Sequence, residues 1–264
     1  MRLKIAHRTE YQYDAPVPYA LQRVRLVPLN NDLQAVLSWS LEIEGAREEL
    51  RFVDHFGNDT RLLSVSGGPH LIAVEAAGEV ETSDRAGVFG THRGFAPLWL
   101  FVPHTALTEP GAGVTGLAQS IAAGPDLERL HGLMALIGEK VAYEPGATTT
   151  VTTAEDALAK AAGVCQDHTH VFLAAARLMG FPARYVSGYL MIGSAGKQVA
   201  THAWAEAHVQ GLDWVGFDVA NGISPDDRYV RIATGRDYRD AMPVSGIRLG
   251  QADERLEVRI TVEQ

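Results

Sequence analysis

Apolar and polar residues alternate in short segments along the N-terminal part of the chain. Segments of this kind lie at residues 3–5, 21–29, 35–44, 50–53, 60–65 and 70–81. Turn-forming residues separate them, as in Asn30-Asn31-Asp32 and Gly67-Gly68-Pro69. Alternation with a period of two is typical of strands that bury one face. Because no helical spacing interrupts these segments, we predict an N-terminal β-sandwich.

Helical spacing replaces this alternation after residue 125. Apolar residues recur three or four positions apart in a predicted helix over 126–141, at Leu127, Leu130, Leu133, Met134, Ile137 and Val141. Thr153 can cap a short helix over 154–161, and the apolar run 171–179, ended by Gly180, predicts a third helix. Strands are predicted afterwards at 184–191, 201–209, 212–218, 228–233 and 255–262. Helices followed by an antiparallel sheet indicate an α+β core.

The stretch between residues 83 and 124 joins these two patterns. Gly, Pro and Thr punctuate it around an aromatic and apolar cluster at 95–102. We predict that this cluster packs between two domains, with the wall of a substrate cleft as the alternative. The predicted domains are therefore an N-terminal β-sandwich over 1–105 and an α+β core over 106–264.

Composition narrows the classes of partner. The 264 residues carry a formal net charge of −9 and a pI near 5.5, which argues against the basic surface that nucleic-acid binding needs. A single cysteine cannot form an intrachain disulfide, so nothing indicates an oxidising compartment. Neither a signal-peptide pattern nor an apolar run of membrane-spanning length occurs. We therefore expect a cytoplasmic protein that binds neither nucleic acid nor membranes.

The single cysteine, Cys165, stands where the loop containing Gly163 turns into the third predicted helix. Unpaired backbone N–H groups and the positive end of the helix dipole meet in a first helical turn, and both favour a thiolate. A cysteine in this position is a candidate nucleophile. The alternative is a buried cysteine that acts as a small apolar side chain.

A thiolate nucleophile needs a proton carrier that is itself oriented by an acceptor. His202 and Asp218 lie on the predicted strands 201–209 and 212–218, which Gln210-Gly211 joins into a hairpin. A three-residue loop places the two side chains diagonally on one face, and a five-residue loop places them directly opposite. A two-residue loop separates them. A pair on the protein surface is the alternative to a catalytic pair.

Longer motifs surround these three residues. They are Gly-Val-Cys-Gln-Asp-His-Thr-His at 163–170, Gly-Phe-Pro-Ala-Arg-Tyr-Val-Ser-Gly-Tyr-Leu at 180–190, Thr-His-Ala-Trp-Ala-Glu-Ala at 201–207 and Trp-Val-Gly-Phe-Asp at 214–218. With this order and spacing the chain resembles the transglutaminase-like superfamily, whose papain-like core carries Cys, His and Asp in that order. The resemblance implies that Cys165 is the nucleophile, His202 the general base and acid, and Asp218 the group that orients the imidazole.

The resemblance extends to the N-terminal region. Residues 11–17 and the turn at 54–58 look like the β domain that precedes the core in many bacterial members, for which we expect a structural or substrate-positioning role. One departure is visible after Asp218, where the family often has Pro-Thr-Asn-Gly and this chain has Val219-Ala220-Asn221-Gly222. The departure puts the shape of that loop in doubt rather than the chemistry.

The resemblance implies acyl transfer through a thioester on Cys165, acting on peptide or glutamine carboxamide bonds of a protein or peptide substrate. If water attacks the thioester, the enzyme is a cysteine protease or amidase. If an amine attacks it, the enzyme is a transglutaminase. The backbone N–H of Cys165 is expected to contribute to the oxyanion site. A noncatalytic peptide-binding module is the alternative of a different class. An arylamine acyltransferase would use the same three residue types, but its arginine-rich context before the cysteine is absent.

The run Asp167-His168-Thr169-His170 could suggest a metal site. Residues two apart on a helix do not share a face, so the two histidines cannot converge on one ion together with Cys165. Zinc needs three or four convergent ligands. We therefore expect neither a metal nor a cofactor. His170 is expected to anchor its helix to the sheet, and Glu206 and His208 are expected on a solvated strand surface.

Overall fold

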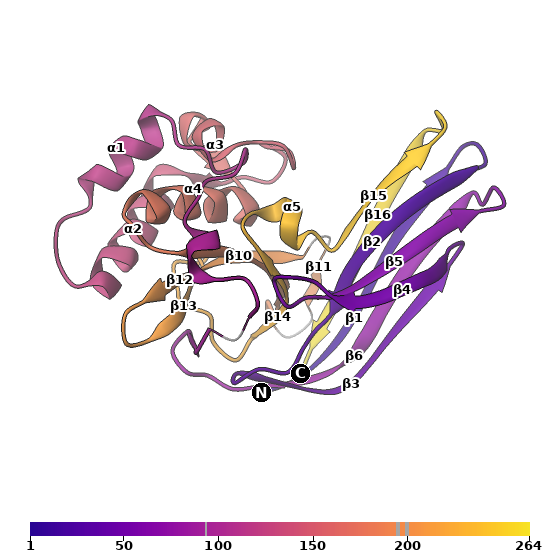
Figure 1. The fold of residues 1–264 in the computed structure, drawn as a ribbon, viewed down its shortest axis with the longest axis horizontal. Coiled ribbons are helices and arrows are strands. Elements are labelled where there is room, and N and C mark those ends of the chain that lie inside the picture. The colour runs from indigo at the N-terminus through magenta and orange to yellow at the C-terminus, as the bar shows by residue number, and fades with distance from the viewer. Residues whose placement is uncertain (93, 194–195, 199–200) are drawn as a thin grey trace.

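The computed structural model describes residues 1–92, 94–193, 196–198 and 201–264 (Figure 1). A strand-only region, formed by the long strands at one side of the view, meets a region in which helices pack on a second sheet. We call the second region the core. This arrangement confirms the predicted α+β fold class.

The strand-only region is a sandwich of two antiparallel sheets. The larger sheet contains β1 (Arg2–Tyr13), β6 (Leu71–Thr82) and β3 (Gln34–Glu44), and the smaller contains β2 (Tyr19–Val27), β5 (Asp59–Ser66) and β4 (Arg47–Val53). Leu26, Leu63 and Val74 are among the side chains that fill the space between the sheets. The predicted N-terminal β-sandwich is therefore confirmed.

The end of the chain completes this sandwich. β15 (Val244–Leu249) pairs with β2, and β16 (Glu254–Glu263) pairs with β1, both antiparallel. The pairing differs from the predicted division at residue 105, which placed both segments in the core. Alternation identifies a strand but does not say which sheet edge the strand joins. A short strand from the core, β11 (Gly196–Gln198), extends the same sheet beyond β16.

One face of the larger sheet contributes side chains to two apolar interiors, that of the sandwich and that of the core. Val74 on this face packs against the smaller sheet, whereas Leu3 and Ile5 pack with the core. His7 belongs to the same face, and its Nδ1 lies 2.8 Å from the hydroxyl of the buried Tyr189 in the core. The sandwich and the core thus share a continuous interior.

The core sheet is antiparallel and runs in the order β14, β10, β12, β13, β7. These strands are β14 (Tyr229–Gly235), β10 (Ala183–Leu190), β12 (His202–Val209), β13 (Asp213–Phe217) and β7 (Val88–Gly90). Helix α4 packs on one face of the sheet, and the other long helices pack around α4 (Figure 1). The helices are α1 (Ala112–Ser120), α2 (Asp126–Lys140), α3 (Ala154–Lys160), α4 (Cys165–Leu178) and the short α5 (Tyr238–Ala241). Within the described ranges, no helix has the length and apolar character needed to cross a membrane.

Two amide side chains of the sandwich hold β14, the edge strand of the core sheet. Gln34 accepts a hydrogen bond from the Arg231 N–H at 2.9 Å and donates to the Arg231 carbonyl at 2.8 Å. Asn58 makes the same pair of bonds with Thr234, both at 2.8 Å. These amides act as a substitute strand on an edge that would otherwise present unpaired backbone groups.

The turn that carries Asn58 is organised by the buried carboxylate of Asp54. This carboxylate accepts hydrogen bonds from the N–H groups of Phe56 and Asn58, each at 3.0 Å, and from Arg25 Nε at 2.9 Å. A buried charge is tolerated only when it is paired and hydrogen-bonded. The turn at 54–58 is therefore fixed in the shape that presents Asn58 to β14.

The aromatic cluster at 95–102 packs in part between the two regions, as predicted. Phe101 and Ala96 are buried against Phe56 from the sandwich and Trp214 from the core. Phe95, by contrast, is 89% exposed. Only the inward-facing residues of the cluster therefore belong to the interface.

We expect Gln34→Ala to lower the free energy of unfolding by about 1–3 kcal/mol, because the Arg231 backbone loses its partners in a buried setting. Urea denaturation measures this change. Gln12→Ala is the matched control, since this strand glutamine makes one exposed hydrogen bond, to Glu10. Equal effects of the two substitutions would show that the hydrogen bonds from the Gln34 side chain to β14 contribute nothing to stability.

Candidate active site

Cys165 occupies the first position of α4, and a dedicated cap fixes that turn. The Asp167 carboxylate accepts hydrogen bonds from the Val164 N–H at 2.8 Å and from the Thr148 hydroxyl at 2.6 Å. A Cβ at Gly163 would lie 2.7 Å from Cβ of Asp167, so this close approach requires glycine. Cys165 as a residue is partly buried and packs against the core.

The β12–β13 hairpin brings His202 and Asp218 together. Val209 faces Asp213, which is the register of the three-residue loop. This register puts the two side chains diagonally on one face, and His202 Nε2 lies 2.6 Å from Asp218 Oδ2. The hydrogen bond to Asp218 leaves Nδ1 as the ring nitrogen available to Cys165, whose side chain is also a hydrogen-bond partner of His202.

The Asp218 carboxylate is fully buried and is surrounded by donors. Besides His202, its Oδ2 accepts from the Tyr229 hydroxyl and from Asn221 Nδ2, both at 2.7 Å. The Asn221 N–H also lies 3.3 Å from Oδ1. These groups come from two strands and a turn, so the carboxylate holds several segments in one geometry.

Electrostatics favour an ionised His202–Asp218 pair. Burial works to lower the pKa of His202, but the hydrogen bonds to Asp218 and Cys165 and their charges outweigh it and raise this pKa to about 10. Burial likewise works to raise the pKa of Asp218, yet the hydrogen bond and charge of His202, with Asn221 and Tyr229, keep it below its ordinary value. An imidazolium beside the thiol stabilises a thiolate.

Aromatic rings hold the imidazole on its other sides. Trp204 stacks on His202 with ring centroids 6.3 Å apart, and Tyr229 contacts both rings. The Trp204 ring lies over β10, where a Cβ on Gly188 would come within 2.6 Å of it. Gly188 therefore makes the space that lets Trp204 reach Tyr229 across the sheet.

Tyr143 lies beside the nucleophile because two short strands pair in parallel. β8 (Ala142–Tyr143) aligns with β9 (Ala162–Gly163), which ends two residues before Cys165. Burial, followed by the charges of Cys165 and Asp218, raises the pKa of Tyr143. Its half-exposed ring also stacks parallel to His168, at a centroid distance of 6.1 Å.

The other polar residues singled out in the sequence serve different purposes. His168 Nε2 lies 2.8 Å from the Val141 carbonyl. His170 is fully buried against Tyr185 of the sheet, as expected for an anchor, and accepts a hydrogen bond from the Tyr238 N–H at 3.2 Å. In the part of the chain that the structure describes, no three His, Cys, Asp or Glu side chains cluster as a metal site would require.

The expectation of a solvated Glu206 is wrong. Glu206 is fully buried, and its Oε2 pairs with Arg184 Nη2 at 2.5 Å. His208 is partly buried and bonds Asp213 at 3.1 Å. The sandwich and the 95–102 connection cover the sheet face opposite α4, so residues that alternate with alanine on β12 are not exposed.

Sequence reasoning also missed two partners of Asp218. The sequence does point to Asn221, since an Asn follows Asp at the same distance in the family motif. That position alone predicts the shape of the loop and not a hydrogen bond to Asp218. Tyr229 had no such signal. It lies on β14, which is separated from β12 by β10, and strand order within a sheet cannot be read from local periodicity.

Comparison with known proteins places this geometry in a family. A model of the transglutaminase-like superfamily matches residues 115–219, and a model of the bacterial transglutaminase-like N-terminal region matches residues 3–81. Residues 115–219 belong to the transglutaminase-like superfamily. The predicted resemblance is therefore confirmed, and the two matched ranges correspond to most of the core and to the N-terminal strands of the sandwich.

Relatives of this protein cover nearly its whole length. An uncharacterized protein of Mycobacterium leprae is 29% identical over 275 residues, covering 99% of this chain and 98% of the relative. An uncharacterized protein of Mycobacterium tuberculosis is 29% identical over 278 residues, covering 93% of this chain and 87% of the relative. A solved structure of a candidate cysteine protease from Cytophaga hutchinsonii superposes with a TM-score of 0.77 at 23% identity, covering 98% of this chain and 90% of that one. That likeness establishes a shared fold.

We expect nuclear magnetic resonance titration to place the pKa of His202 near 10 and to show a strong decrease in Asp218→Asn. In this variant, burial of the imidazole is no longer opposed by the adjacent carboxylate. Asp213→Asn, which changes the other carboxylate paired with a histidine on this hairpin, is the control and should leave His202 near 10. A value that stays near 10 in Asp218→Asn would contradict the assignment.

The same shift predicts a pH dependence of stability. The folded-state pKa of His202 lies above its ordinary 6.5, so its contribution to the free energy of unfolding is complete below pH 6.5 and is lost as the pH rises through about 10. Denaturation across this window should show the loss in the natural protein. Asp218→Asn should show a much smaller change.

Proposed function

We propose that this protein is a thiol-dependent acyl-transfer enzyme with Cys165, His202 and Asp218 as its catalytic triad. The observation that carries the proposal is the hydrogen-bonded, buried His202–Asp218 pair next to Cys165, a partly buried cysteine in a first helical turn. The proposed substrate is a peptide or glutamine carboxamide of a protein or peptide.

In the proposed reaction, the Cys165 sulfur attacks the carbonyl carbon after its proton has passed to His202. The oxyanion forms near the Cys165 N–H, which as a first-turn donor has no acceptor within its own helix. The carbon–nitrogen bond then breaks, and the proton on His202 passes to the departing amine. A thioester remains on Cys165. Asp218 keeps the imidazole oriented and stabilises its charge through both transfers.

The second half of the reaction decides the enzyme class. With water as the nucleophile, His202 accepts its proton, the thioester is hydrolysed, and the enzyme is a cysteine protease or amidase, which is the reaction we propose. With a primary amine as the nucleophile, the product is a new amide and the enzyme is a transglutaminase. The Cytophaga hutchinsonii structure is described as a candidate cysteine protease. It supports the first alternative only through the shared fold.

We expect incubation with a glutamine-containing protein, with and without an added primary amine, to separate these reactions. Ammonia release, chain cleavage and amine incorporation each identify a different one. Cys165→Ala should abolish whichever is seen, and Asp218→Asn should lower its rate by about 10⁴-fold, through a misoriented imidazole. Asp213→Asn should retain the rate, because that carboxylate contacts His208 on the far end of the hairpin. Activity that survives Cys165→Ala would exclude the thioester mechanism.

A second experiment distinguishes an enzyme from a noncatalytic peptide-binding module. Brief treatment with dilute iodoacetamide at neutral pH should alkylate Cys165 faster than a model thiol, because the neighbouring imidazolium stabilises the thiolate. Mass spectrometry measures the extent. His202→Ala should slow the labelling, whereas His208→Ala, on the same strand, should not. Slow labelling of the unsubstituted protein would favour the binding module.

A further inference from the structure

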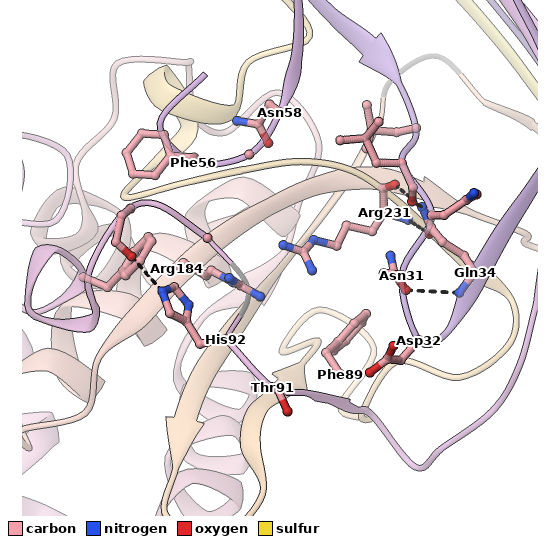
Figure 2. Close-up of a pocket in the computed structure, with 17 residues that line it drawn as sticks. Asn31, Asp32, Gln34, Phe56, Asn58, Phe89, Thr91, His92, Arg184 and Arg231 are labelled. Atoms are coloured by element: carbon pink, nitrogen blue, oxygen red, sulfur yellow. Dashed lines mark hydrogen bonds between the residues drawn. The ribbon is translucent and has the colours of Figure 1, made fainter. Parts of the chain in front are cut away.

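A cavity lies between the sandwich and the core, on the sheet face opposite α4 (Figure 2). Its volume is about 220 Å³. Its walls come from the sandwich loops at 29–34 and 56–58, the connection at 89–101, and strands β10 and β14. None of the proposed catalytic residues lines it, so it is a feature separate from the triad.

The guanidinium groups of Arg184 and Arg231 both lie near the buried carboxylate of Glu206, beside the cavity. Glu206 pairs through Oε2 with Arg184 at 2.5 Å, while Arg231 Nε remains 3.8 Å from Glu206 Oε1. That distance exceeds a hydrogen bond, and Oε1 accepts none from any described residue. One buried carboxylate is thus shared between two arginines.

The Arg231 guanidinium points into the cavity in Figure 2. Among the described residues no acceptor lies within hydrogen-bonding distance of it, although its backbone is held by Gln34. Both arginines lie over aromatic rings, Arg231 at 5.9 Å from the Phe89 centroid and Arg184 at 3.9 Å from the Trp214 centroid, but only Arg184 is hydrogen-bonded to Glu206. Of the described residues that line the cavity, Arg231 is therefore the cation that an incoming ligand would meet.

Besides the two arginines, His92 and Asp32 are the titratable residues on the described part of the wall. His92 donates from Nε2 to the Ala96 carbonyl at 2.7 Å and accepts from Trp214 Nε1 at 3.0 Å, which fixes a neutral ring. Burial lowers the pKa of His92, in agreement with that state. Asp32 also lines the cavity, beside Gly90, and takes part in an interaction of its own.

The remaining wall is in part apolar and in part polar. Phe56, Phe89 and Phe101 line the cavity together with Leu29 and Ile232, and amide or hydroxyl side chains also line it, from Asn30, Asn31, Gln34, Asn58 and Thr91. At about 220 Å³ the space is smaller than the roughly 300–1,000 Å³ of pockets for drug-sized molecules. A ligand that fits these walls is small and has an apolar body with one charged end.

We propose that this cavity binds a small monocarboxylate with an apolar body, its carboxylate on Arg231 and its body against the phenylalanine rings. A planar carboxylate matches the fork of a guanidinium group. A single carboxylate supplies the hydrogen-bond acceptor that the Arg231 guanidinium lacks among the described residues. A dianion such as phosphate would instead bring excess negative charge next to Glu206 and Asp32.

The test uses 3-phenylpropanoate as the probe and calorimetric titration of the full chain as the measurement. We expect saturable binding of the acid, and no saturable binding of the matched neutral 3-phenylpropanamide or of inorganic phosphate. Arg231→Gln should weaken binding by roughly tenfold or more, the size expected for a lost charged hydrogen bond. Arg231→Lys, which keeps the charge but not the planar fork, should fall between the two.

Arg236→Gln is the matched control, because this arginine follows β14 directly and pairs with Asp240 outside the cavity. It should bind the probe as the unsubstituted protein does, and so should Cys165→Ala. Circular dichroism verifies that each variant is folded. Absence of saturable binding by the acid, equal binding of the amide, preference for phosphate, or unchanged affinity in folded Arg231→Gln would each overturn the proposal. Loss of binding in Cys165→Ala would also overturn it, because the probe would then occupy the triad rather than the cavity.

Discussion

The buried negative charge of Asp218 is the constraint around which the site is built. A carboxylate removed from water is costly unless donors surround it. Here the donors are His202 on β12, Asn221 in the following turn and Tyr229 on β14, all directed at Oδ2. Because one oxygen must meet all three, the two strands and the turn have little freedom relative to one another. The orientation of the imidazole toward Cys165 follows from this arrangement, and it would be lost if any one segment shifted.

This constraint explains why the sandwich matters to the core. Tyr229 begins β14, and β14 is an edge strand whose outer backbone groups are held by Gln34 and Asn58. Asn58 is in turn fixed by the Asp54 carboxylate. The sandwich also pairs with the loop that leads to His202, through β11 on β16. The sandwich thus supports two of the segments that converge on Asp218, through its N-terminal residues at β14 and its C-terminal strand β16 at β11.

The sequence predicted local features well and spatial neighbours poorly. The Gln210-Gly211 turn predicts the hairpin, and of the loop lengths left open the structure has the three-residue one, which places His202 and Asp218 on one face. The apolar run after Cys165 likewise predicts the start of α4. Tyr229 and the β16 strand could not be placed, because local periodicity carries no information about which strand lies next to which. Glu206 was misjudged for a related reason, since its strand alternates polar and small apolar residues but is covered on both faces.

The pairing of β16 with β1 makes the sandwich depend on both ends of the chain. Lys4 faces Glu263, so β1 takes its neighbour on one edge from a strand that follows the whole core in sequence (Figure 1). Leu3 and Ile5 of β1 are in turn buried together with core residues. Contacts this distant in sequence close a long loop, and the entropic cost of that closure grows only slowly with the length of the loop. The core is therefore an insertion within a sandwich that its own C-terminal strands complete, and the support that β14 and β11 receive is available only in the finished chain.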